Sequence, residues 1–227
     1  MTMLALASDE RMPYRTADTR EMIVVHRALL RYTNYLATVA PTIDTADEVA
    51  VQTARAVAVE LVGALRALDA AHKELLWPTL LGYLDATGTD TDSIATVAQR
   101  HDDLGTWCTA VVRAIGTAGF AAAVAGLAEN LTRQLAEVER VAFPAAERYM
   151  TERQWRDLVE RFVAELGAGE RGHLLLGGLL YAGSRRERGR IARGSRRGKL
   201  TAIAYRRTFD KRFAAVQSVL GCERPAQ

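Results

Sequence analysis

Three of the four histidines in the chain, His26, His72 and His101, lie in apolar stretches with helical periodicity. Each stands in a different predicted helix, and a fourth predicted helix carries Glu139. Imidazole nitrogens bind Fe, Zn, Cu and Ni, and a carboxylate neutralises part of the charge of the ion. Helical proteins build metal sites from such inward-facing side chains on neighbouring helices. The four residues therefore predict a site for a single divalent ion, with Fe or Zn as the metal.

Two other interpretations of these residues stay open at the level of sequence. In the first, the cluster binds no metal and lines a pocket for a small-molecule ligand or substrate. His72, His101 and Glu139 are then the candidates for proton transfer, because buried imidazoles and carboxylates have shifted pKa values. In the second, the histidines are structural core residues whose nitrogen atoms are satisfied by internal hydrogen bonds.

Four long amphipathic segments must position these side chains. Their apolar residues recur with a period near 3.6, and no segment alternates with a period of two. Pro, Gly and polar clusters separate the segments, which predict helices over residues 18–39, 45–76, 94–115 and 121–149. Long helices joined by short connections favour an all-α fold, here an up-down-up-down four-helix bundle over residues 18–150 with additional C-terminal helices.

The details of the helices follow from local signals. Capping-box spacing predicts N-caps at Asp18, Thr45 and Thr151, since each is followed three residues later by Glu or Gln. The predicted buried stripe of the second helix is Leu61, Leu65, Leu68, His72 and Leu75, and that of the fourth is Leu127, Leu131, Gln134, Val138 and Val141.

A faint internal repeat aligns residues 71–78 with residues 137–144. Both segments end on an aromatic residue followed by proline, Trp77-Pro78 and Phe143-Pro144. Proline removes a backbone donor and disturbs a helix interior, so each pair predicts a helix end or a kink. We interpret the two aromatic residues as packing residues of a duplicated helical hairpin.

The residues around these positions resemble the hemerythrin-like, or HHE cation-binding, domain family. The resemblance rests on Leu-Leu-Trp-Pro after His72, Phe-Pro after Glu139, the early His26, and Gln-Arg before His101. It is strongest over residues 20–156 and is closest to the long actinobacterial type with a C-terminal helical extension. It implies a four-helix bundle with a cation site at its centre.

Members of that family hold a pair of iron atoms, and this chain departs from their ligand pattern. Leu68, Gly105 and Gln134 stand where the family has ligands, and His72 takes the place of a carboxylate. The resemblance leaves His26, His72, His101 and Glu139 as the metal ligands, with Asp69 and Gln134 as helpers. A standard diiron centre is therefore not expected, and the ligand set is degenerate.

The resemblance implies redox or small-molecule chemistry, or sensing, at a reduced cation site rather than oxygen carriage. The alternative is a metal-independent enzyme of the isomerase, cyclase or lyase type in specialised metabolism. That enzyme would use the former ligand positions as its substrate pocket.

Residues 151–221 are predicted as a helical extension, and its residues 184–199 are strongly basic. It contains eight Lys and Arg and one Glu, so its net charge is +7, whereas that of the whole chain is +3. Without interleaved aromatic residues or a binding motif, it does not predict specific nucleic-acid recognition. It favours a solvated loop or a gate for anionic substrates. A non-catalytic regulator that binds an anionic partner through residues 185–199 is a third functional hypothesis.

Composition excludes several other classes. The longest weakly polar run is too short to span a bilayer, and the N-terminus lacks the pattern of a signal peptide. Two cysteines are too few for a disulfide scaffold or a Cys-rich zinc site. We therefore expect a cytoplasmic protein without a membrane span, whose oligomeric state the sequence leaves open.

Overall fold

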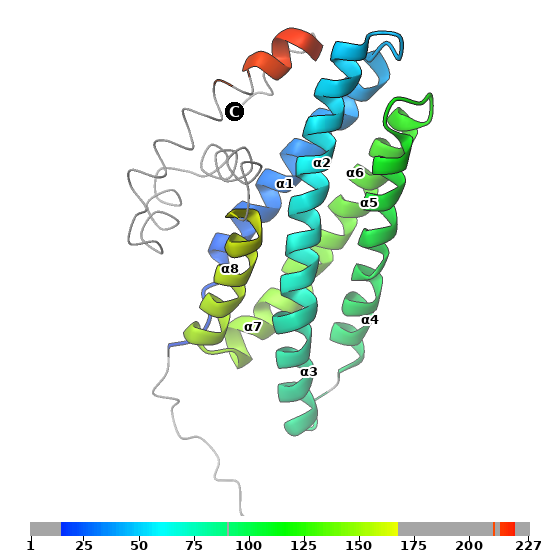
Figure 1. The fold of residues 1–227 in the computed structure, drawn as a ribbon. Coiled ribbons are helices and arrows are strands. Elements are labelled where there is room, and N and C mark those ends of the chain that lie inside the picture. Colours follow the sequence, from blue (N-terminus) through cyan, green and yellow to red (C-terminus); the bar gives the residue numbers. More distant parts are fainter. Residues whose placement is uncertain (1–14, 90, 168–210, 212–213, 221–227) are drawn as a thin grey trace, which may run out of the picture.

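The structure, a computed structural model, describes residues 15–89, 91–167, 211 and 214–220 (Figure 1). The chain is all-helical over these ranges, and their β-structure is limited to an isolated bridge between Thr16 and Thr151. The basic residues 184–199 and His173 lie outside the described residues, as does most of the predicted helical extension over residues 151–221.

The helices follow one another closely in sequence. In order they are α1 (Arg20–Val39), the short η1 (Ala40–Thr42), α2 (Glu48–Ala71), η2 (His72–Leu76), α3 (Trp77–Ala86), α4 (Asp92–His101), α5 (Asp103–Ala114), α6 (Phe120–Glu137), η3 (Val138–Ala142), α7 (Phe143–Tyr149) and α8 (Glu152–Gly167). The elements η2 and η3 are π-helices that join the helices on either side without a break.

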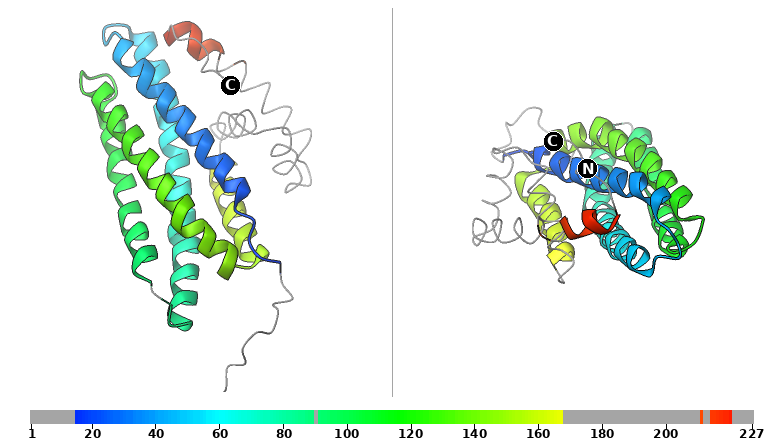
Figure 2. Two further views of the ribbon diagram at one scale, coloured as in Figure 1. Left: turned by 180° about the vertical axis from the view of Figure 1, so that it is seen from behind. Right: turned by 90° about the horizontal axis from the view of Figure 1, so that it is seen from above.

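The long helices lie side by side around a common core (Figure 2). Helix α1 packs against α2 and α6, and α5 packs against α2 and α6, so each of the four contacts two others. Helix α8 lies across α2 and η2.

Among the described residues, we find no helix that combines the length and the apolar character needed to cross a membrane.

The predicted buried stripes are confirmed over most of their length. Leu61, Leu65, Leu68 and His72 are buried in the core, as are Leu127 and Leu131. The stripes then shift by one residue, because Leu75 and Val141 are only half-buried while Leu76 and Ala142 are fully buried. An α-helix continued without change would have kept Leu75 and Val141 on the inner face.

The two π-helices explain this shift. The N–H of Trp77 bonds to the carbonyl of His72, five residues back, and the N–H of Phe143 bonds to that of Val138 in the same way. This wider turn adds one residue before each aromatic-proline pair and moves the register by one position. The helices therefore continue through Trp77-Pro78 and Phe143-Pro144, where the sequence predicted an end or a kink.

Of the three predicted N-caps, one is confirmed and two are wrong. The box at Thr151 is confirmed, since Gln154 accepts from the Thr151 N–H at 2.9 Å and donates its own N–H to Thr151 Oγ1 at 3.3 Å. The prediction at Thr45 is wrong: Asp47 caps α2, because its extended backbone lets its carboxylate accept from two amides of the first turn. The prediction at Asp18 is also wrong, since α1 begins after Thr19 and Asp18 pairs with Arg20.

The segment before α1 is joined to the start of α8. Besides the bridge between Thr16 and Thr151, the Ala17 N–H donates to the Met150 carbonyl at 3.1 Å. The Glu152 N–H donates to the Arg15 carbonyl at 2.7 Å. These bonds tie residues 15–17 to the junction between α7 and α8.

Candidate functional site

The structure brings the four candidate residues together in the core. His26 comes from α1, His72 begins η2, His101 ends α4, and Glu139 lies in η3. The three imidazoles are buried, whereas the Glu139 side chain is 34% exposed. Two of the four residues therefore stand within the π-helices that the internal repeat marks.

The four side chains form two pairs. His26 Nδ1 lies 2.9 Å from Glu139 Oε1, and His72 Nδ1 lies 3.3 Å from His101 Nε2. The rings follow one another in a row, with centroids 6.1 Å apart for His26 and His72 and 5.0 Å apart for His72 and His101. A carboxylate accepts hydrogen bonds, so His26 donates its Nδ1–H to Glu139 and keeps the lone pair on Nε2.

Aromatic side chains enclose this row. Phe143 stacks on the His26 ring with centroids 5.1 Å apart, and Trp77 stands edge-on to His72 and His101 at 5.5 and 5.8 Å. Trp77 and Phe143 were predicted as packing residues, and their packing partners are the imidazoles themselves. The repeat of aromatic-proline pairs after His72 and Glu139 is the sequence signal that could have indicated these contacts.

Asp69 and Lys73 border the site beside His101. Asp69 Oδ1 lies 3.6 Å from His101 Nε2, and Asp69 Oδ2 accepts from the Lys73 ammonium at 3.0 Å. The same ammonium lies 3.0 Å from Asp102 Oδ1. Lys73 therefore joins η2 to the end of α4, a role that the sequence analysis did not predict.

The positions that lack family ligands have other roles. Gln134 donates from its amide to the Arg100 carbonyl at 2.8 Å, which ties α6 to α4. Leu68 is fully buried in the apolar core. A Cβ built on Gly105 would have no described atom within 4 Å, so space is left at that position. Cys108 is a buried core residue, and burial raises the pKa of its thiol to about 12.

Burial dominates the electrostatics of the cluster. It lowers the pKa of His26, although the hydrogen bond to Glu139 acts in the opposite direction. It lowers the pKa of His72 further, helped by the other two imidazoles, and that of His101 to about 4. Burial also raises the pKa of Asp69. The imidazoles are therefore neutral at pH 7, the form that binds metals and accepts protons.

Several buried atoms of the cluster have no hydrogen-bond partner within the described part of the chain. They are His26 Nε2, His72 Nε2, His101 Nδ1 and Asp69 Oδ1. A buried polar atom without a partner costs about 1–3 kcal/mol, so each of these groups calls for a partner such as an ordered water or a bound ion.

A divalent ion fits the facing nitrogens of the imidazole pair, His72 Nδ1 and His101 Nε2, together with Asp69 Oδ1, and not the unpartnered imidazole nitrogens. Two ligands on one tetrahedral ion lie about 3.3 Å apart when each bond is about 2.0–2.1 Å long. The His72 Nδ1 to His101 Nε2 distance matches this value, and Asp69 Oδ1 is only slightly farther away. As the described side chains stand, no group of three or more His, Cys, Asp or Glu is arranged to hold a metal ion. Asp69 would have to turn toward the imidazole pair.

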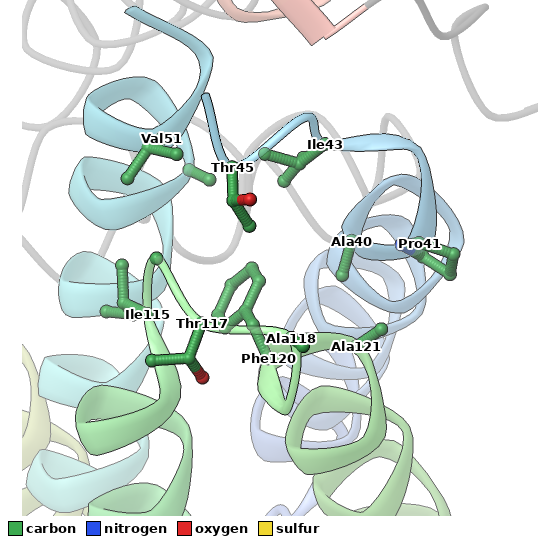
Figure 3. A pocket seen from close by; sticks show the side chains of 12 residues that line it. Ala40, Pro41, Ile43, Thr45, Val51, Ile115, Thr117, Ala118, Phe120 and Ala121 are labelled. Carbon is green, nitrogen blue, oxygen red and sulfur yellow. The ribbon is translucent and has the colours of Figure 1, made fainter. Parts of the chain in front are cut away.

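A separate pocket lies where the α1–α2 connection meets the turn between α5 and α6 (Figure 3). It has a volume of about 170 Å³, and Ile43, Val51, Ile115 and Phe120 contribute apolar walls. It shares no residue with the histidine cluster.

Comparison with protein-family models finds none that matches the chain, and comparison with curated proteins and solved structures finds no significant match.

Proposed function

We propose that the chain is a hemerythrin-like four-helix bundle that holds a single divalent cation, and that this cation serves redox or small-molecule chemistry, or sensing. The observation that carries the proposal is the contact between His72 Nδ1 and His101 Nε2 at 3.3 Å, beside the unpartnered Asp69 Oδ1. Neutral imidazoles and a carboxylate are a ligand set suited to Fe or Zn.

In this proposal His72, His101 and Asp69 hold the ion, and His26 and Glu139 take a different role from the one expected. Because Glu139 engages His26 Nδ1, it orients that ring rather than serving as a ligand. His26 Nε2 has no hydrogen-bond partner among the described residues, and its lone pair can accept a proton from a bound molecule. A bound ion would supply Lewis acidity or a redox couple at this place.

The neighbouring groups of this chain prepare the site. Lys73 neutralises the outer oxygen of Asp69 and holds that carboxylate near His101. Trp77 and Phe143 exclude water from the faces of the rings. The exclusion of water lowers the local dielectric constant and so strengthens electrostatic interactions inside the cluster.

The experiment is metal analysis of the full-length protein after anaerobic reconstitution with Fe²⁺ and, separately, Zn²⁺. We expect about one ion per chain in the wild type and loss of the ion in His101→Gln and Asp69→Asn. Glu137→Gln is the control, since Glu137 pairs with Arg100 outside the cluster. The proposal fails if the wild type retains no more metal than the His101→Gln variant.

A second candidate is the metal-independent enzyme, which the internal pairing of all four groups favours. His26 is joined to Glu139 and His72 to His101, as in acid–base dyads. Deuterium incorporation into 1,3-dicarbonyl compounds by chelator-treated protein in D₂O tests it. Exchange should be lost in the His72→Ala, Glu139→Gln double variant, and full exchange in that variant would refute this candidate.

A further inference from the structure

Helix α8 contributes no side chain to the histidine cluster, but it contacts residues within or next to the two π-helices. It packs against α2 and η2, and its inner face is buried through Trp155, Leu158, Phe162 and Leu166. Two of its residues reach the immediate neighbours of the histidines, each by a different kind of contact.

The first contact is a stack of rings. Trp155, which is 4% exposed, stands edge-on to Phe143 with centroids 5.5 Å apart. Phe143 in turn stacks on His26. The Trp155 Nε1 has no hydrogen-bond partner among the described residues. Trp155 therefore packs against the Phe143 ring, and Phe143 in turn packs against His26.

The second contact is a paired hydrogen bond. The Arg161 guanidinium donates from Nε to Glu74 Oε2 at 2.8 Å and from Nη2 to Glu74 Oε1 at 3.1 Å. Arg161 is also paired with Glu165 on its own helix, which fixes the guanidinium in place. Glu74 lies within η2, two residues after His72. Such two-point contacts fix geometry as well as adding energy.

We propose that α8 positions the two halves of the histidine cluster separately, with Trp155 acting on His26 through Phe143 and Arg161 acting on His72 through Glu74. Both are positioning residues. A π-helix is rare and occurs mostly as a single turn inside an α-helix, frequently at a functional site, so contacts that hold such a turn in place bear on the site. This inference extends the proposed cation site, but the positioning itself concerns the metal-free protein.

The test is NMR of the imidazole rings in full-length, metal-free protein labelled with ¹⁵N-histidine, with signals assigned by single His→Gln variants. Arg161→Ala should shift the His72 ring signals and leave those of His26 unchanged. Trp155→Leu should do the reverse, and Trp155→Phe should keep the His26 signals near their wild-type positions. Arg156→Ala is the matched control, because it breaks a pair with Glu152 on α8 that does not reach the cluster.

Titration with Co²⁺ provides a second measurement. Arg161→Ala should weaken Co²⁺ binding about tenfold, as loss of support around a metal ligand does, while Arg156→Ala leaves it unchanged. The positioning role is refuted if Arg161→Ala and Arg156→Ala give the same ring signals, or if Trp155→Leu leaves His26 unmoved. If the wild type binds no Co²⁺, the cation site is refuted, and the ring signals still decide the positioning role.

Discussion

His26 and Glu139 lie 113 residues apart in the sequence, and their side chains meet at 2.9 Å. One is fully buried and the other is a third exposed, so the pair connects the surface of the protein to the centre of the helices. The carboxylate fixes the tautomer of the ring, because it accepts the Nδ1–H and leaves a lone pair on Nε2. This relationship connects the His26 side of the cluster to water through Glu139.

Removal of the Glu139 carboxylate should therefore lower the stability of the protein. Glu139→Ala leaves His26 Nδ1 buried without an acceptor and should lower the free energy of unfolding by about 1–3 kcal/mol at pH 7.5. Glu139→Gln keeps an acceptor oxygen and should cost less. Glu137→Ala, which breaks only the pair with Arg100, serves as the control in urea unfolding. An equal effect of the two alanine variants would contradict this assignment.

The cluster should also make the protein sensitive to acid. The folded-state pKa values of His26, His72 and His101 lie below the unfolded value near 6.5. Below about pH 6.5 the unfolded chain binds protons that the folded protein does not, so stability falls with pH. For His101 this loss continues to about pH 4, the folded-state pKa.

Each such histidine contributes at most about 1.4 kcal/mol per pH unit to that slope. Asp69 acts in the opposite direction, because its raised pKa lets the folded protein take up a proton before the unfolded chain does. His101→Gln should make the stability curve flatter between pH 6.5 and 4 in chemical unfolding followed by circular dichroism. A slope unchanged from that of the wild type would show that His101 is charged in the folded protein.

The register of the π-helix η2 predicts which of two adjacent leucines contributes more to the stability of the protein. Leu76 is fully buried and Leu75 only half-buried, so Leu76→Ala should cost about 2–5 kcal/mol and Leu75→Ala clearly less. In an uninterrupted α-helix the order would be reversed. Urea unfolding of the two variants compares them directly, and a larger loss for Leu75→Ala would rule out the π-helical register.

Gly126 and Gly63 should respond differently to the same substitution. A Cβ on Gly126 would come within 2.9 Å of Trp107 Cζ3, whereas a Cβ on Gly63 meets no described atom within 4 Å. Gly63→Ala should stabilise the protein by about 0.5–1 kcal/mol through backbone entropy and helix propensity. Gly126→Ala should lose that gain and displace the Trp107 ring, with a change in tryptophan fluorescence. Equal stabilisation by both changes would contradict the close packing of Trp107 on α6.

Periodicity was sufficient to predict the helices and most of their buried faces, because a 3.6-residue apolar pattern fixes which side of a helix faces the core. It also placed His26, His72 and His101 on inner faces. It missed the one-residue shift at Leu75, since a π-turn depends on backbone bonds around Pro78 and not on the apolar pattern.

The pairing within the cluster was beyond sequence reasoning. Which imidazole meets which carboxylate depends on how far each helix slides and turns in the packed core. Glu139 was predicted as a ligand, and the structure joins it to His26. Lys73, which holds Asp69, was given no role from the sequence because its second partner, Asp102, is distant in sequence.

The bonds that tie residues 15–17 to residues 150–152 also bear on the order of events during synthesis. Chains leave the ribosome from the N-terminus, and contacts between distant segments must wait for the later one. The first described residues therefore cannot reach their final place until the start of α8 has emerged. The N-terminal segment therefore docks only after α1 to α7 have been synthesised, and with them His26, His72, His101 and Glu139.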